Sequence, residues 1–164
     1  FNMPIITLID TPGAYPGMKA EEHGQGIAIA ENLRDMMSLT VPTVSVITGE
    51  GCSGGALGLA VTNKVFMLEN SYYTVISPEG CASILWNDAS FAPQASDKLR
   101  ITAQDLSELG IIDGIIPEPK GGAHKDIEKT AENLKSALLL ALDELSKLTK
   151  KEILSQRFEK FRNF

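Results

Sequence analysis

The order of apolar segments along the chain constrains its fold more than any other sequence feature. Short apolar runs occupy residues 4–10, 44–47 and 64–68, and segments with apolar residues at helical spacing lie between them. Strands that alternate with helices in this way pair in parallel, because each crossover helix returns the chain to the same end of the sheet. The sequence therefore predicts an α/β fold with a parallel sheet.

The remaining segments continue this alternation. A fourth strand is expected at residues 72–76 and a short apolar element at 111–116, whereas the Pro- and Gly-broken residues 11–22 are expected to form a loop. Helices are predicted at residues 24–39, 53–61, 78–86, 94–110 and 127–148, followed by a mixed-charge helix. We expect a core at residues 1–125 and a helical C-terminal extension at residues 126–164.

Charge is distributed unevenly along the chain. The net charge is −6, but residues 147–164 hold six Lys or Arg and two Glu, so residues 1–146 carry −10. An acidic body argues against binding to nucleic acid. The basic segment could dock on an acidic partner or form the solvated end of a helix, and we favour the solvated helix.

Bulk features narrow the class of protein further. No apolar run approaches the roughly 20 residues that span a bilayer, so no membrane span is predicted. The chain starts at Phe1 and enters a strand almost at once, and we expect it to be part of a longer polypeptide. Cys52 and Cys81 form neither a C-x-x-C pair nor a disulfide framework, which favours a reducing compartment and no metal site in this chain.

The segment Asp10-Thr11-Pro12-Gly13 follows the first predicted strand, as the magnesium- and phosphate-sensing turn of a GTPase does. A GTPase also needs a G-x-x-x-x-G-K-[ST] loop, whose amides and lysine neutralise the phosphates. The chain contains no such loop. We therefore reject the GTPase interpretation.

Residues 48–57, TGEGCSGGAL, join a predicted strand to a predicted helix. The small residues allow a sharp turn and a close approach by a ligand. The first amides of the following helix would favour an anion, including one that forms only during a reaction. A tight turn with close packing of strand on helix explains the same residues equally well.

Gly51-x-Ser53-x-Gly55 also matches the G-x-S-x-G turn of a serine hydrolase, with Ser53 as the nucleophile. Such a serine needs a general base. The histidines of the chain are His23 and His124, and neither lies in a segment with an evident reason to approach Ser53.

Four segments resemble, in the same order, the C-terminal half of the carboxyltransferase α subunit of the multi-subunit acetyl-CoA carboxylases of bacteria and plastids. The segments are DTPGAYPG at residues 10–17, GEGCSGGAL at 49–57, YTVISPEGCASILW at 73–86 and IIPEPKGGAH at 115–124. Two residues depart from the usual family pattern, since Cys52 replaces a glycine and His23 replaces an arginine. Cys52 at a helix N-terminus could be a reactive thiol or could pack behind the turn.

The resemblance implies a crotonase-like superhelix of ββα turns that lacks its first turns. It places Asp10–Gly17 beside the active-site cleft and makes the backbone amides of Gly54 and Gly55 an oxyanion hole. The substrate-binding residues implied by the resemblance are Gly13, Ala14, Tyr15, Gly51, Ser53, Pro78, Glu79 and Gly80.

The family transfers a carboxyl group from carboxybiotin on a carrier protein to acetyl-CoA and forms malonyl-CoA for fatty-acid synthesis. The resemblance assigns the biotin oxygen to Gly54 and Gly55 and the thioester oxygen to a second subunit. It implies no protein acid or base and no cofactor bound covalently to this chain.

The partners implied are a carboxyltransferase β subunit in an α2β2 assembly, the biotin carboxyl carrier protein and biotin carboxylase. Zinc is expected only in the β subunit, and the location is the bacterial cytoplasm or the plastid stroma. A non-catalytic crotonase-like assembly subunit and a ClpP-like serine peptidase remain as alternatives.

Overall fold

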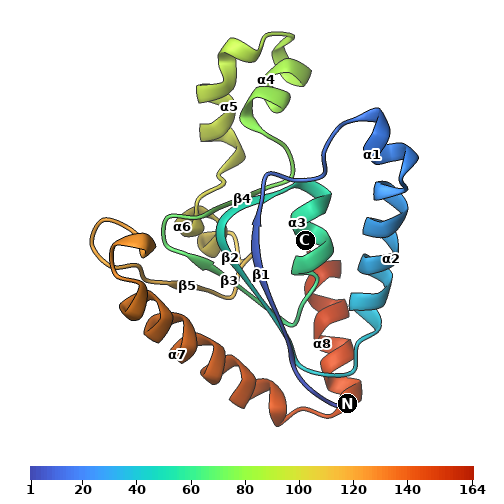
Figure 1. Cartoon of the computed structure of the whole chain (residues 1–164), viewed down its shortest axis with the longest axis vertical. Helices are drawn as coiled ribbons and strands as arrows, with labels where there is room; N and C mark the ends of the chain where they lie inside the picture. The colour runs from blue at the N-terminus through green and yellow to red at the C-terminus, as the bar shows by residue number, and fades with distance from the viewer.

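A five-stranded sheet forms the centre of the computed structural model, which describes residues 1–164 (Figure 1). Its main path runs β1–β2–β3–β5, and every neighbouring pair along it is parallel. The strands are β1 (Ile5–Thr11), β2 (Thr43–Cys52), β3 (Lys64–Leu68), β4 (Tyr72–Thr74) and β5 (Gly114–Ile116). The predicted parallel sheet is confirmed.

Strand β2 continues well beyond residue 47, where the sequence predicts its end. Its first half pairs with β3, and its second half, after a register shift against β1, pairs with β4. At the shift, the Asp10 carboxylate accepts a hydrogen bond of 2.9 Å from the Glu50 amide. A Cβ atom added to Gly49 would lie 2.6 Å from Asp10 Oδ1, so a side chain there would force the carboxylate to move. Asp10 therefore holds the irregular turn of the sheet.

Most predicted helices are present, with two differences. The predicted loop at residues 11–22 contains a short helix, and the predicted helix at 94–110 is broken at Arg100, whose φ of 50° ends one helix before the next begins. The helices are α1 (Met18–Glu22), α2 (Gln25–Ser38), α3 (Ser53–Ala60), α4 (Pro78–Trp86), η1 (Ala89–Phe91), α5 (Ala92–Leu99), α6 (Ala103–Glu108), η2 (Ala123–Lys125), α7 (Ile127–Ser146) and α8 (Lys150–Arg162).

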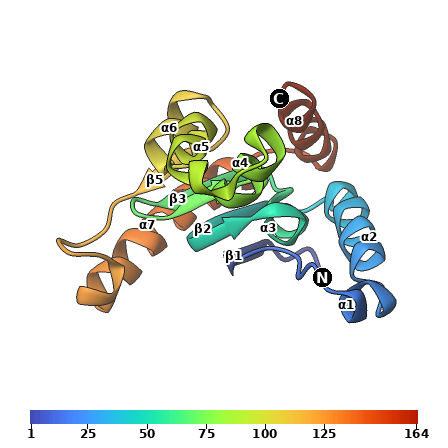
Figure 2. The same cartoon turned by 90° about the horizontal axis from the view of Figure 1, so that it is seen from above.

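Helices cover both faces of the sheet (Figure 2). On one face, Ile9 and Ile47 pack with the small residues Ala56 and Ala60 of α3 and with Leu106 of α6. On the other face, Val44 and Val46 pack against α7, which contributes the half-buried or buried residues Leu134, Leu138, Ala141 and Leu145. The small side chains of α3 allow this helix to lie close to the strands and bring its N-terminus to the carboxyl end of β2.

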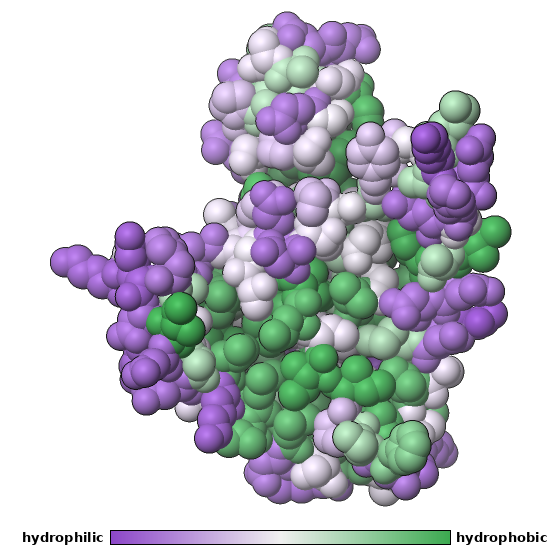
Figure 3. Space-filling view, viewed as in Figure 1, coloured by the Kyte–Doolittle hydropathy of each residue, from purple (hydrophilic) through white to green (hydrophobic).

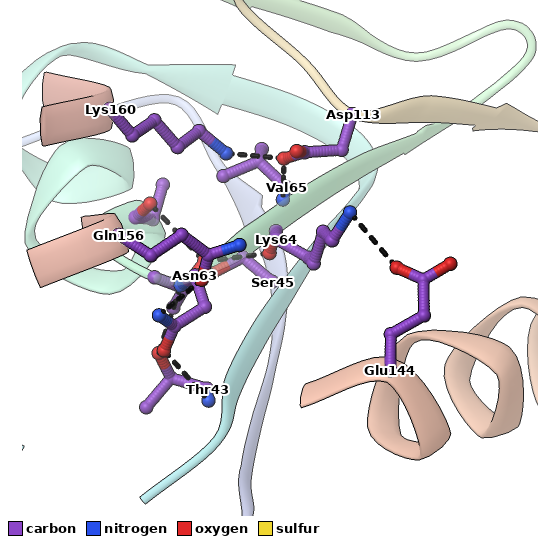
Figure 4. A network of polar contacts seen from close by, with 11 residues as sticks. Thr43, Ser45, Asn63, Lys64, Val65, Asp113, Glu144, Gln156 and Lys160 are labelled. Atoms are coloured by element: carbon purple, nitrogen blue, oxygen red, sulfur yellow. Dashed lines mark hydrogen bonds and ion pairs between the residues drawn. The ribbon is translucent and has the colours of Figure 1, made fainter. Parts of the chain in front are cut away.

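Helix α8 is attached to the body by polar contacts, several of which are visible in Figure 4. Asn63, between α3 and β3, donates to the Ile153 carbonyl and to Gln156 Oε1, both at 2.8 Å. Asp113 accepts a 2.7 Å hydrogen bond from the Val65 amide and forms an ion pair with Lys160 of α8. These contacts bind α8 to the start of β3.

Arg157 of α8 is completely buried and has no carboxylate partner among the ion pairs of the structure. Its guanidinium donates to the carbonyls of Met36 and Leu39 at 2.8 and 2.9 Å, at the C-terminus of α2, and to Asn63 Oδ1 at 2.7 Å. The negative end of the α2 dipole stabilises this charge. The prediction of a solvated basic helix holds for Lys147, Lys150, Lys151 and Arg162, which are exposed, but is wrong for Arg157.

Helices α4 and α5 stand away from the body as an arm (Figures 1 and 2). They pack mainly against each other and against η1, where the rings of Trp86 and Phe91 lie 5.9 Å apart. Ile84 and Leu85 on this arm are 72% and 61% exposed.

Besides the exposed Ile84 and Leu85 of the arm, the chain has an apolar surface on β1. Figure 3 shows an extended apolar area over the middle of the molecule on the side viewed there. Ile6 and Leu8 pair in register with Val44 and Val46, so all four side chains point to the same side of the sheet. Helix α7 covers the two valines, whereas Ile6 and Leu8 remain 42% and 57% exposed.

None of the helices combines the length and the apolar character that a membrane span requires.

Candidate functional site

The N-terminus of α3 presents unpaired backbone amides at the carboxyl end of β2. Ser53, Gly54 and Gly55 are its first three residues, and no side chain caps it. Such amides have no carbonyl partner within the helix and carry the positive end of the helix dipole. The turn from strand to helix is made at Ser53, whose φ of 58° is unusual for a residue with a side chain. Gly54 and Gly55 thus lie in the first turn of a helix that directly follows a strand, as the sequence predicts, and their role in stabilising an anion stays a prediction.

The loop that follows β1 packs directly against this turn. A Cβ atom added to Gly13 would lie 3.0 Å from Ser53 Cβ, and one added to Gly55 would lie 3.0 Å from the Gly13 carbonyl carbon and 3.1 Å from the Ala14 nitrogen. The absence of side chains at both glycines therefore permits the close approach of loop and helix. The structure brings together Gly13, Ala14, Ser53 and Gly55.

The backbone amide of Ala14 is a further hydrogen-bond donor near this turn, and the sequence does not identify it as part of an oxyanion hole. Its amide makes no hydrogen bond to any group of the chain. The amide on one side of it donates to Thr11 Oγ1, and that of Tyr15 on the other side donates to Gln25 Oε1. A free amide thus lies beside the first turn of α3.

Gly51 has a packing role next to this site. A Cβ atom there would lie 3.1 Å from atoms of both Ile47 and Tyr73. Burial raises the pKa of the Tyr73 hydroxyl to about 12, so this group is neutral at physiological pH. Tyr15 is 71% exposed, and its backbone, not its ring, is held by hydrogen bonds to the body.

The predicted substrate-binding residues Pro78, Glu79 and Gly80 lie elsewhere, in the first turn of α4 at the base of the arm. The Gly80 amide is already occupied, because it donates to the capping Ser77 Oγ at 3.1 Å. Glu79 accepts a hydrogen bond from Ser83 through its backbone carbonyl. None of the hydrogen bonds of this segment reaches Gly54 or Gly55.

In the structure no side chain forms a hydrogen bond with the Ser53 hydroxyl, as a general base would. Neither His23, which ends α1, nor His124, in η2 beyond β5, forms a hydrogen bond with its hydroxyl. Cys52, the residue before it, is buried, and burial raises the pKa of its thiol, which disfavours the reactive thiolate. No group of three or more His, Cys, Asp or Glu side chains could hold a metal ion.

A cavity of about 280 Å³, not foreseen from the sequence, lies next to the turn. Tyr73 lines it and also contacts Gly51, so the cavity begins just behind the glycine-rich segment. Its other walls are nearly all apolar and come from α3, β3, the ends of α5 and α6, and the C-terminal end of the chain: Leu57, Ala60, Val65, Leu99, Leu106, Ile111, Phe161 and Phe164, with Thr74 and Val75 of the β4 segment.

All of residues 1–164 match the family described as acetyl co-enzyme A carboxylase carboxyltransferase-like. The chain belongs to this family. It is 58% identical over 163 residues to the acetyl-coenzyme A carboxylase carboxyl transferase subunit alpha of Staphylococcus aureus strain Newman, and 57% identical to that of strain JH9. These matches cover 99% of this chain and 52% of each relative. The chain therefore spans about half the length of the curated relatives it matches.

The fold of the chain is also similar to those of several solved structures. A Pseudomonas malonate decarboxylase hetero-tetramer in complex with coenzyme A gives a TM-score of 0.76 at 15% identity, over 93% of this chain and 60% of that chain. Transcarboxylase 12S gives 0.74 at 19% identity, over 90% and 28% of the two chains. A probable enoyl-CoA hydratase from Mycobacterium thermoresistibile gives 0.58 at 12% identity, over 98% and 68%. The expected crotonase-like fold is confirmed.

Proposed function

We propose that the protein is the α subunit of an acetyl-CoA carboxylase carboxyltransferase, which moves a carboxyl group from carboxybiotin on a carrier protein to acetyl-CoA to give malonyl-CoA. The match of all 164 residues to the carboxyltransferase family carries this proposal. The turn at residues 53–55 supports it, because amides that no side chain caps at a helix N-terminus suit a reaction in which negative charge develops on oxygen.

In the proposed reaction, the amides of Gly54 and Gly55 hold the oxygen of the biotin ring as its carboxyl group departs as CO2. The electron pair left on the ring removes a proton from the acetyl methyl group, and the resulting carbanion forms a carbon–carbon bond with the CO2. The chain needs to supply only donors for an oxygen anion. This agrees with the structural role of Asp10 in the neighbouring loop, whose carboxylate accepts a hydrogen bond from the Glu50 amide.

The free amide of Ala14 is a further donor in this proposal. It lies against Gly55, across the contact between the loop and α3, so one oxygen could accept from both segments. Donors that are fixed before the reaction stabilise the transition state without a cost of reorganisation. We propose that Gly13, Tyr15, Gly51 and Ser53 shape this pocket, and that Pro78, Glu79 and Gly80 reach substrate only in the assembled enzyme.

The proposed partners are a zinc-containing β subunit in an α2β2 assembly, the biotin carboxyl carrier protein and biotin carboxylase. The relatives are named as α subunits, and similar structures include a hetero-tetramer, which supports assembly with other chains. The matched relatives are bacterial, which supports a bacterial cytoplasm over a plastid as the proposed location.

The strained turn at Ser53 favours one competing function, a serine hydrolase. We expect Ser53→Ala to retain most of the carboxyl transfer, because it removes the hydroxyl and leaves every amide in place. The measurement is malonyl-CoA formation by the full-length subunit, reconstituted with the β subunit and carboxylated carrier. Ser53→Gly, which tolerates the positive φ, is the companion variant. Loss of activity in both would identify a serine nucleophile, and an inactive wild-type complex would refute the proposed function.

A further inference from the structure

Residues 12–16, the loop that packs on α3, have a single polar anchor to the rest of the chain. Gln25 Nε2 donates to the Tyr15 carbonyl at 3.0 Å, and Gln25 Oε1 accepts from the Tyr15 amide at 3.1 Å. The other hydrogen bonds of this segment are local, from Gly13 to Thr11 and from Gly17 to Tyr15. One side chain thus pairs with both backbone groups of the residue that follows Ala14.

Gln25 is the first residue of α2, and the same helix contacts the first turns of α3. A Cβ atom added to Gly54 would lie 3.6 Å from the Ile29 side chain, and Asn32 Nδ2 donates a hydrogen bond to the Gly58 carbonyl. The other end of α2 is held by the buried Arg157. Helix α2 therefore contacts both halves of the candidate site, the loop through Gln25 and helix α3 through Ile29 and Asn32.

We propose that Gln25 is a positioning residue, which sets the place of the Ala14 amide relative to the amides of Gly54 and Gly55. It does not touch the reacting atoms and acts through the backbone of Tyr15. Without it, the loop remains against α3 only through van der Waals contacts at Gly13 and Ala14. The role in catalysis rests on the proposed carboxyltransferase function, whereas the anchoring of the loop does not.

Three variants of the full-length subunit test the anchoring. Gln25→Met keeps the length of the side chain and removes both hydrogen bonds. Gln25→Glu keeps an acceptor for the Tyr15 amide but at neutral pH has no donor for its carbonyl. Gln104→Met is the matched control, because Gln104 is exposed in the first turn of α6 and forms no hydrogen bond through its side chain.

Hydrogen–deuterium exchange of residues 11–17 is the first measurement. We expect exchange in Gln25→Met to be about tenfold faster than in wild type, from the loss of hydrogen bonds that each contribute about 1 kcal/mol. The exchange rate in Gln25→Glu should lie between those of Gln25→Met and wild type, and the rate in Gln104→Met should match wild type. Equal exchange in Gln25→Met and Gln104→Met, at equal thermal stability, would overturn the anchoring.

Steady-state kinetics of the complex with the β subunit is the second measurement. Donors used mainly in the transition state affect kcat more than KM, so we expect Gln25→Met to lower kcat about tenfold and to change the KM for acetyl-CoA less than twofold. Gln25→Glu should recover part of kcat. Faster exchange with an unchanged kcat would overturn the positioning role. An inactive wild-type complex would refute the proposed function, while the exchange result would still decide whether Gln25 anchors the loop.

Discussion

At the scale of single residues, two neighbouring glycines of the candidate site differ in what surrounds them. A Cβ on Gly55 would meet the backbone of Gly13 and Ala14 at 3.0 to 3.2 Å, whereas a Cβ on Gly54 would meet only the Ile29 side chain at 3.6 Å. Backbone atoms cannot move aside as a flexible side chain can. The two positions should therefore respond differently to the same substitution.

We expect Gly55→Ala to lower carboxyl transfer at least tenfold, equivalent to about 1.4 kcal/mol, because the added methyl group must push the loop and its Ala14 amide away from α3. Gly54→Ala keeps the amide and makes an ordinary contact with Ile29, so its rate should stay within about threefold of wild type. Both variants are compared in the reconstituted complex, with thermal unfolding as the control for folding. Equal losses of carboxyl transfer in Gly54→Ala and Gly55→Ala would contradict the steric argument.

At the scale of secondary structure elements, α8 is held through Arg157, which links it to the C-terminus of α2. Its guanidinium satisfies carbonyl groups that end a helix, and burial lowers its pKa, although an arginine stays charged at physiological pH. Burial also has a cost, because the Nε atom of Arg157 is buried without a hydrogen-bond partner. Removal of the side chain would leave several buried acceptors without donors.

Arg157→Met should lower the free energy of unfolding by about 3 kcal/mol, since hydrogen bonds to a charged group are lost and buried carbonyls remain unpaired. Lys151→Met, at an exposed position on the same helix, should change it by less than about 0.5 kcal/mol. Chemical denaturation of both variants gives the comparison. The loss at Arg157 should be nearly the same at low and high salt, because a buried group is poorly screened; a strong salt dependence would indicate a surface interaction instead.

At the scale of the whole molecule, the sheet is covered on both faces except over β1, an edge strand whose residues Ile6 and Leu8 are exposed. Exposed apolar areas of this kind promote association, and an unpaired strand edge adds to the tendency. The predicted division into a core and an extension after residue 125 falls just before Asp126, the N-cap of α7, and stays a prediction.

We expect residues 1–164, when isolated, to self-associate through the β1 face. The double variant Ile6→Thr/Leu8→Thr keeps strand-forming residues and removes apolar surface, so it should weaken association at least tenfold, or by about 1.4 kcal/mol. Sedimentation velocity over a range of concentrations measures this. The variant Ile84→Gln/Leu85→Gln on the arm is the comparison, and a larger effect there would assign the association to the arm.

Several features of the site could be predicted from the sequence because they are encoded locally. The apolar runs and their helical spacing predict the parallel sheet and α7, and the small residues at 49–57 predict the turn that exposes the amides of Gly54 and Gly55. The role of Asp10 could not be predicted, because its partner, the Glu50 amide, is 40 residues away. A single acidic residue after a strand is equally compatible with a metal ligand and with a structural hydrogen bond.

The sequence by itself thus determined most of the elements, their parallel pairing, and the glycine turn, since hydrophobic periodicity and glycine act over a few neighbouring residues. Only the tertiary structure decided which charged residue of α8 is buried, because helical spacing does not distinguish Arg157 from the exposed lysines on the same helix. It also decided that Gln25 meets Tyr15 and that the Ala14 amide stays free beside Gly55. Such pairings depend on how α2 and α3 pack, and that packing follows from contacts between residues far apart in the chain.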